Sequence, residues 1–271
     1  MEKFVSDMTP ERIAKFRFYE ELNDFLPKEK QKKCFPYAFK YNQSVKDAIE
    51  ALGIPHAEVD LILVNGNSQD FTYTLKNGDY ISVYPVFESI DISGVTRLRA
   101  KPLREIKFVL DVHLGKLCKY LRMLGFDTYY RNNLGDDEIV RISTTENRII
   151  LTRDIGILKN GKVLHGYWVR SQDSKKQLWE VVQRFDLNDQ LRPFYRCIVC
   201  NGLINPVEKK DIEHLLRENT KAFFNNFYQC QTCGKIYWEG SHFENMQEFV
   251  ENVISGKKTK RISPFDKQIK K

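Results

Sequence analysis

The sequence predicts three folded parts in one chain: an α+β module, an α/β domain built on a parallel sheet, and a small four-cysteine metal module. Three observations support this prediction. Strands surround one short helix before residue 90, strands and helices alternate between residues 106 and 170, and two Cys-x-x-Cys pairs follow. A length of 271 residues suits more than one domain.

The first part begins with KFRFYE at residues 15–20, where charged and aromatic residues alternate as in a half-buried strand. Residues 44–53 predict a short helix, because Ser44 can cap its start, apolar residues recur at helical spacing and Gly53 can end it. Further strands are predicted at residues 61–66, 71–75 and 80–85, with a turn at residues 77–79.

The motifs LILVNG and NGDYISVYP make residues 14–88 similar to β-grasp, ubiquitin-like domains related to the small sulfur carriers. Sulfur carriers act through a free C-terminal Gly-Gly, whereas here the last strand is expected to continue through residues 86–90. The resemblance therefore implies a module that docks a protein partner. We place this domain at residues 14–90 and a basic linker at residues 91–105.

Two predicted strands of the middle region end on an acid. The apolar run at residues 106–110 is followed by Asp111, and the strand predicted at residues 148–153 is followed by Asp154. Because ligands of a parallel sheet collect at the carboxyl ends of its strands, both carboxylates are expected there. Asp136, at the start of the helix before the Asp154 strand, could reach the same place. A helix at residues 114–125 and strands at residues 126–130 and 162–170 complete the pattern.

Three converging carboxylates would repel one another, and a hard divalent cation removes that conflict. Mg²⁺ and Mn²⁺ favour carboxylate oxygens, and such an ion can bind a phosphodiester and activate water. The alternative is that Asp136 and Asp137 serve only as helix cap and dipole partners, and that an acid after a strand is a turn residue. The shared position of Asp111 and Asp154 favours the metal site.

The segments FVLDVHLGKLCKYLRMLGFD, GDDEIVRI and RIILTRDIGIL resemble the PIN-like nuclease domain of the Mut-seven C-terminal RNase family. Bacterial members carry a β-grasp domain before it and a zinc ribbon after it, so the resemblance spans about residues 14–247. It implies hydrolysis of RNA with Mg²⁺ or Mn²⁺ held by clustered acids. By position these are Asp111, Asp136 and Asp154, with Asp137 and Glu138 as candidates for a further acid.

The cysteine pattern predicts a structural zinc site. Cys197, Cys200, Cys230 and Cys233 form two Cys-x-x-Cys turns, which together supply the closed set of four thiolates typical of such sites. Iron held by the same thiolates is the alternative, and a redox role would need a thioredoxin-like pattern that the sequence lacks. The remaining cysteines are expected to be a free thiol and a buried helix residue, Cys34 and Cys118.

Several basic and aromatic residues are candidate RNA contacts. Lys116 and Arg153 could contact phosphate near the acids, and Lys235 and His242 could do so near the second cysteine pair, although solvated charges are the alternative. Six aromatic residues at positions 223–238 could stack on unpaired nucleotides, but we expect most of them to form the core of the ribbon. The insert at residues 206–217 predicts a short helix that buries Ile212, Leu215 and Leu216.

The net charge of +7 lies mostly at the C-terminal end, where residues 256–271 hold seven basic residues against one acid. This basic tail could contact RNA or act as a solubilising end. No stretch is apolar enough to span a membrane and the first residues do not read as a signal peptide, so we expect a cytoplasmic protein.

The predicted architecture is thus an α/β PIN-like parallel-sheet domain at residues 106–190, preceded by the α+β β-grasp domain and followed by a zinc ribbon at residues 191–250. The leading hypothesis is a metal-dependent ribonuclease whose structural zinc ribbon helps to hold RNA. The alternative is a non-catalytic RNA-binding or ribosome-associated adaptor that uses the zinc ribbon and the basic tail.

Overall fold

The computed structural model describes residues 11–85 and 106–255. The chain divides into two compact units. The first joins the chain up to residue 105 with residues 140–168, and the second joins residues 106–139 with residues 169–271. The predicted strand end at residues 86–90, the basic linker and the basic tail lie outside the described residues.

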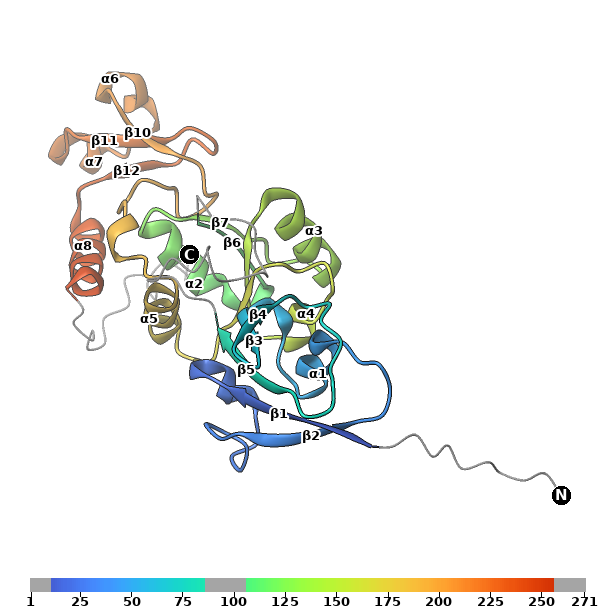
Figure 1. Ribbon diagram of the computed structural model, residues 1–271. Helices are drawn as coiled ribbons and strands as arrows, with labels where there is room; N and C mark the ends of the chain where they lie inside the picture. The colour runs from blue at the N-terminus through green and yellow to red at the C-terminus, as the bar shows by residue number, and fades with distance from the viewer. Residues whose placement is uncertain (1–10, 86–105, 256–271) are drawn as a thin grey trace. The chain divides into compact units, whose positions relative to one another are not determined.

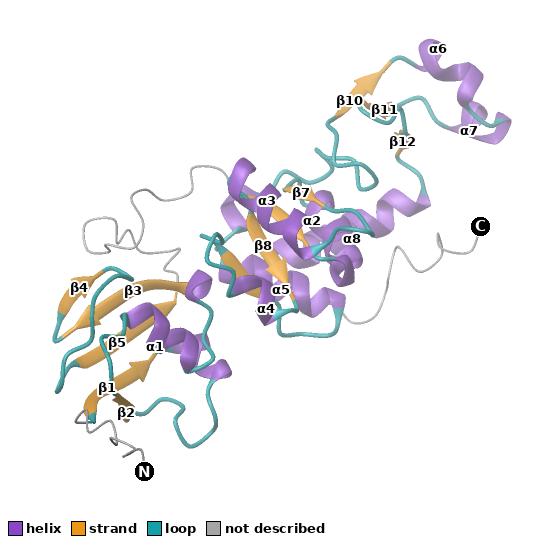
Figure 2. Cartoon of the chain, turned by 90° about the vertical axis from the view of Figure 1, so that its right-hand side faces the viewer, coloured by secondary structure: helices purple, strands orange, loops and turns teal. Residues whose placement is uncertain are grey.

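A mixed five-stranded sheet with the order β2-β1-β5-β3-β4 makes up most of the first unit (Figure 2). Strand β1 runs antiparallel to β2 and parallel to β5, while β3 runs antiparallel to both β5 and β4. This confirms the β-grasp arrangement that the sequence predicts. The strands are β1 (Arg12–Phe18), β2 (Phe35–Phe39), β3 (Val59–Val64), β4 (Asn67–Gln69) and β5 (Tyr80–Pro85). Short 3-10 turns, η1 (Glu20–Phe25) and η2 (His56–Glu58), connect them.

Helix α1 (Val45–Ala51) lies against one face of this sheet (Figure 2). The Ser44 hydroxyl accepts a hydrogen bond from the Asp47 backbone N–H at 3.1 Å, which confirms the predicted cap. Val45 and Ile49 are fully buried in the same core as the strand residues, so the helix is held mainly by its apolar face.

The prediction of a strand at residues 71–75 is wrong. One isolated bridge joins Thr74 to Ser44, and the Val45 backbone N–H donates to the Tyr73 carbonyl at 2.7 Å. The backbone of this segment therefore pairs with the loop that leads into α1, not with the sheet. Phe71 and Tyr73 pack against the core of the first unit and are partly buried there. This packing accounts for the apolar residues of a segment that is not a strand.

Strands β8 (Ile149–Thr152) and β9 (Gly166–Trp168) complete the first unit as a parallel pair connected through α4 (Ile155–Leu158). This pair contacts the β-grasp module directly. The Trp168 backbone N–H donates to the Glu58 carboxylate at 2.5 Å, and the Phe25 and Trp168 rings lie 5.2 Å apart. A nitrogen of the buried His56 ring lies 3.0 Å from the Val163 carbonyl. The β-grasp domain is therefore built into the same compact unit as β9.

The second unit begins with a parallel pair, β6 (Lys107–Leu110) and β7 (Asp127–Tyr129), connected through η3 (Val112–Leu114) and α2 (Gly115–Met123). Gly125 ends this helix with φ +96°, and a side chain there would collide with the Arg192 carbonyl. Helix α3 (Asp136–Glu146) starts in the second unit and continues from Val140 in the first. Helix α5 (Ser174–Arg184) packs against α2. The two parallel pairs, β6 with β7 and β8 with β9, confirm a parallel sheet.

The C-terminal part of the second unit is a three-stranded antiparallel sheet in the order β10-β11-β12, followed by α8 (Ser241–Ile254) (Figure 1). Its strands are β10 (Ile204–Val207), β11 (Phe227–Cys230) and β12 (Ile236–Trp238). The 3-10 turn η4 (Asn188–Gln190) precedes it, and the insert contains α6 (Lys209–Ile212), η5 (Glu213–Leu215) and α7 (Glu218–Phe223).

The insert corrects one predicted burial. Ile212 is buried as expected, but Leu215 is 58% exposed and Leu216 is only half-buried. The single helix predicted over residues 206–217 breaks at Ile212, and the 3-10 turn that follows does not continue its apolar face. Within residues 11–85 and 106–255, no helix has the length and apolar character needed to cross a membrane.

Candidate metal centres

The four cysteines of the ribbon come together as predicted. Their sulfur atoms all lie within 4.8 Å of one another, with 3.7 Å between Cys197 and Cys233 and 3.3 Å between Cys200 and Cys230. Sulfurs bound about 2.3 Å from a tetrahedral zinc ion lie about 3.8 Å apart, whereas a disulfide requires about 2.05 Å. The cysteine cluster therefore fits a tetrahedral metal ion and not a pair of disulfides.

The two cysteine turns carry the backbone geometry of metal knuckles. Asn201, just after Cys200, has φ +72°. The backbone N–H groups of Gly202 and Thr232 donate to the sulfurs of Cys200 and Cys230, each at 3.4 Å. A side chain at Gly202 would collide with that of Thr232. Hydrogen bonds of this kind orient thiolate ligands and offset part of their negative charge.

The Tyr237 hydroxyl lies 3.0 Å from the Cys197 sulfur and donates to it. Burial raises the pKa of the Cys197 thiol, but the hydrogen bonds from Tyr237 and from nearby backbone groups outweigh burial and lower this pKa to about 7. At Cys200 burial prevails and raises the pKa to about 12. A metal ion must therefore displace protons from this cluster. The cysteine spacing gave no sign of the contribution of Tyr237.

The first knuckle is fixed to the end of α2 and to β7. The buried Arg122 guanidinium donates to the Thr128 carbonyl at 3.0 Å and to the Val199 carbonyl at 2.7 Å. The Asn201 side chain donates to the Asp127 carboxylate at 2.8 Å and accepts from the Thr128 N–H at 3.0 Å. The zinc ribbon is thus hydrogen-bonded to the strand pair of its own unit.

Asp111 directly follows β6, as predicted, and is 4% exposed. Its carboxylate accepts the His113 backbone N–H at 2.7 Å, and the neighbouring Val112 carbonyl accepts the Tyr130 hydroxyl at 3.0 Å. A side chain at Gly115 would approach that hydroxyl to 2.7 Å, so the glycine makes room for it. Burial is the main cause that raises the pKa of Tyr130, which keeps the phenol a donor. Sequence reasoning missed this tyrosine.

Asp136 and Asp137 lie exposed in the first turn of α3, where their charge also suits the helix dipole. The Glu138 carboxylate forms an ion pair with Arg131. Glu138, which was a candidate for a further metal ligand, is therefore engaged by a cation on its own unit.

Asp154 follows β8 and caps α4, where its carboxylate accepts the Gly156 N–H at 2.7 Å. Its own N–H donates to the Thr152 hydroxyl at 2.8 Å, and Thr152 is completely buried. The threonine two residues before the acid thus fixes the turn that presents an exposed Asp154 carboxylate. The Thr-x-Asp pattern was the sequence signal for this interaction.

The structure places the three predicted acids in two units. Asp111 and Asp136 belong to the second unit, and Asp154 belongs to the first. The binding of one ion by all three stays a prediction.

The candidate RNA contacts are spread over several elements. Lys116 is exposed on α2, and Arg153 is half-buried after β8. Lys235 is exposed and its ammonium lies 5.8 Å from the centre of the Tyr237 ring. His242 falls within α8, and its side chain lies outside what the structure describes.

The other two cysteines lie where expected. Cys34 is an exposed free thiol, and Cys118 is buried in α2, where burial raises its pKa to about 11. Of the six ribbon aromatics, which we expected mostly in the core, only Phe227 is buried, while Phe224, Tyr228 and Tyr237 are half-buried. The two exposed ones are Phe223 (78%) and Trp238 (38%).

Comparison with known families gives the identification. Residues 106–250, more than half of the chain, match the model of the Mut7-C RNAse domain. The chain belongs to the Mut7-C family. Residues 11–91 of this Mut7-C chain also match the Mut7-C ubiquitin domain, so both resemblances seen in the sequence are confirmed. Searches of curated proteins and of solved structures gave no match. The RNAse domain supports a nuclease-type function.

Proposed function

We propose that this Mut7-C chain is a ribonuclease that hydrolyses RNA phosphodiester bonds with Mg²⁺ or Mn²⁺ held by Asp111, Asp136 and Asp154. One observation carries the proposal. Asp111 and Asp154 each follow a strand of a parallel pair, within the region that matches the RNAse domain. Ligands of parallel sheets bind outside the carboxyl ends of the strands.

The surroundings of the acids fit a hard cation. The His113 and Gly156 backbone N–H groups each hold an oxygen of Asp111 and Asp154, which limits the rotation of both carboxylates. Carboxylate oxygens are the ligands that Mg²⁺ and Mn²⁺ prefer. When bound, such a cation would contact phosphate oxygens and make a water molecule acidic enough to attack phosphorus.

The zinc ribbon has a different role in this proposal. Four thiolates close the coordination sphere of zinc, which leaves no position for substrate or water. In this proposal the zinc site stabilises the fold of the ribbon, and cleavage depends on the acids. The surface of the ribbon helps to bind RNA.

The test is cleavage of a fluorescent single-stranded RNA by purified protein with Mn²⁺. Asp111→Asn and Asp154→Asn should abolish cleavage, because an amide keeps the acceptor for the backbone N–H but loses the charge that binds the cation. Asp189→Asn, which changes an exposed acid in η4, is the matched control and should leave cleavage unchanged. Equal cleavage by the wild type and both site variants would refute the proposal.

The second candidate, a non-catalytic RNA-binding or ribosome-associated adaptor, makes a different prediction. RNA binding would need no divalent ion, would weaken as salt rises, and would survive both Asp→Asn changes, with no cleavage by any variant. The basic ribbon residue Lys235 and the basic tail are the features that it would use.

We also propose that the domain boundaries are those predicted from the sequence and that the β-grasp domain docks a protein partner. Contacts inside the first unit decide how this should be tested. Deleting the β-grasp domain would expose Trp168, which packs on Phe25 and bonds to Glu58. Changes at exposed residues of the sheet, such as Ile13 (47% exposed), are therefore better tests of partner capture than a deletion.

A further inference from the structure

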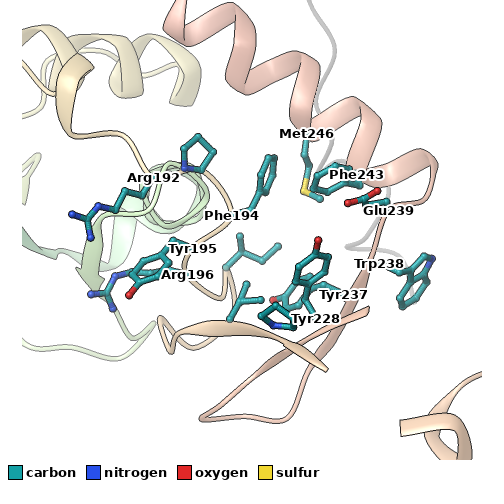
Figure 3. A pocket seen from close by; sticks show the side chains of 14 residues that line it. Arg192, Phe194, Tyr195, Arg196, Tyr228, Tyr237, Trp238, Glu239, Phe243 and Met246 are labelled. Carbon is teal, nitrogen blue, oxygen red and sulfur yellow. The ribbon is translucent and has the colours of Figure 1, made fainter. Parts of the chain in front are cut away.

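A cavity of about 560 Å³ opens in the second unit between residues 192–198, the ribbon strands and α8 (Figure 3). Its volume lies within the range of sites that hold small organic ligands. Its lining is mostly apolar. The aromatic side chains that line it are Phe194, Tyr195, Tyr228, Tyr237, Trp238 and Phe243.

The wall formed by residues 192–198 is held in a strained conformation. Phe194 has φ +62°, a value that bulky residues rarely adopt. Its backbone N–H donates to the Met123 carbonyl at 2.8 Å, and the Arg192 N–H donates to the Leu124 carbonyl at 2.9 Å. The Phe194 ring packs against Phe243 of α8, with 4.7 Å between ring centres. Such strain persists only where surrounding structure imposes it, and it is common at binding sites.

Accessible rings and a positive charge line the cavity, with Tyr195 and the arginines on one side and Trp238 on the other (Figure 3). Tyr195 and Trp238 are 40% and 38% exposed, so their faces can be reached from solvent. The exposed Arg192 guanidinium lies 6.0 Å from the centre of the Tyr195 ring (Figure 3). Arg196 also lines the cavity, but its guanidinium pairs with the Asp127 carboxylate at 3.4 Å and donates to the Asn201 carbonyl at 3.0 Å. One acid, Glu239, stands among the lining residues.

We propose that this cavity binds an unpaired nucleobase of RNA, with Arg192 contacting the phosphate beside it. The inference rests on the proposed function for the identity of the substrate. Single-stranded RNA is recognised by stacking its bases on aromatic rings and by contacting its phosphates with cations. Aromatic rings and the exposed cation of Arg192 are both present here, whereas a purely apolar ligand would gain nothing from Arg192.

The site also depends on zinc. The Tyr237 ring lines the cavity while its hydroxyl donates to the Cys197 sulfur. The metal cluster thereby orients one aromatic wall of the cavity, and the base-binding surface requires a folded ribbon.

The test is fluorescence anisotropy with zinc-loaded protein and no added divalent cation, so that no cleavage intervenes. The probes are labelled hexaadenylate RNA and an abasic strand of the same length and charge. Stacking of a single base should make hexaadenylate bind about five- to a hundredfold more tightly than the abasic strand.

Variants of the lining residues test whether the base binds in this cavity. Tyr195→Ala and Tyr228→Ala should each weaken hexaadenylate binding by about fivefold or more and leave abasic binding unchanged. Tyr41→Ala, which removes a 63% exposed ring that does not line the cavity, is the control and should change neither. Zinc content is measured for each variant, and if Tyr228→Ala loses zinc, the exposed Tyr195 decides the result.

Equal affinity for the two probes would overturn the inference, as would wild-type affinity in both tyrosine variants. Failure of the proposed function gives a different pattern. If the protein cleaves no RNA but discriminates between the probes through Tyr195 and Tyr228, the base site stands and the nuclease proposal fails. If the protein cleaves RNA but binds both probes equally, the nuclease proposal stands and the base site fails.

Discussion

Replacing Arg122 by Met should destabilise the second unit and weaken its hold on zinc. Arg122 is 4% exposed, and its guanidinium donates to the carbonyls of Thr128 at 3.0 Å, Val199 at 2.7 Å and Ile198 at 3.3 Å. Two of these carbonyls lie inside the first cysteine knuckle. Methionine keeps most of the apolar stem but cannot donate to any of the three.

The expected loss follows from these bonds. A hydrogen bond from a charged donor contributes roughly 1.5–3 kcal/mol, so the bonds to Thr128 and Val199 together contribute about 3–6 kcal/mol. Removing a buried charge recovers part of its desolvation cost. We therefore expect a loss of about 3 kcal/mol in the free energy of unfolding, and faster release of zinc because the knuckle loses its anchor.

Denaturant unfolding of the zinc-loaded protein measures the free energy of unfolding. Transfer of zinc to a chromogenic chelator measures the rate of zinc release. Arg122→Lys is the informative control, since it keeps the charge but lacks the planar fork that reaches several carbonyls, and it should fall between wild type and Arg122→Met. A loss under about 1 kcal/mol for the methionine variant, with unchanged zinc release, would refute the anchoring role.

Three further predictions concern the metal centres. Cys230→Ser should release zinc and unfold the ribbon, whereas Asp111→Asn should keep zinc and lose only cleavage. Measuring the zinc content of each variant beside the RNA cleavage assay checks both expectations. Loss of zinc from the Asp111→Asn protein would contradict the separate roles of the two sites. Burial raises the pKa of Cys200 to about 12 and also raises that of Cys233, so both thiols are protonated at neutral pH. Zinc affinity should therefore fall at least a hundredfold per pH unit, about tenfold for each of these two protons, between pH 8 and pH 6, where Cys197 with its pKa of about 7 adds to the effect. A pH-independent affinity in chelator competition would disprove it. Tyr237→Phe removes the hydrogen bond to the Cys197 sulfur and should lower zinc affinity about tenfold in the same assay, while an unchanged affinity would show the bond to be unimportant.

The sequence predicted the four-cysteine cluster well because its members come in local pairs. A Cys-x-x-Cys turn brings two sulfurs together through the chain itself, so only the meeting of the two turns depended on the fold. The positions of Asp111 and Asp154 after strands were predicted for a similar reason, since each is fixed by the apolar run before it.

Features set by distant contacts could not be predicted in this way. The sequence analysis did not single out Arg122, whose buried guanidinium is bonded to Val199, a residue of another segment. The strand predicted at residues 71–75 failed because the hydrogen-bond partners of its backbone come from the loop before α1. The aromatic cavity likewise needs three segments that meet only in the folded unit.

The contacts around β7 link the cysteine ribbon to the parallel sheet of its own unit. Strand β7 lies at an edge of its sheet, where backbone groups lack a neighbouring strand. On Thr128 those groups are bonded to side chains instead, because its N–H donates to Asn201 and its carbonyl accepts from Arg122. Asn201 belongs to the first cysteine knuckle, and β7 pairs with β6, the strand that Asp111 follows. Zinc bound by the four cysteines would stabilise a knuckle that in turn completes the sheet edge next to a proposed catalytic strand. We therefore expect loss of zinc to lower the proposed cleavage even though the ion takes no part in the chemistry.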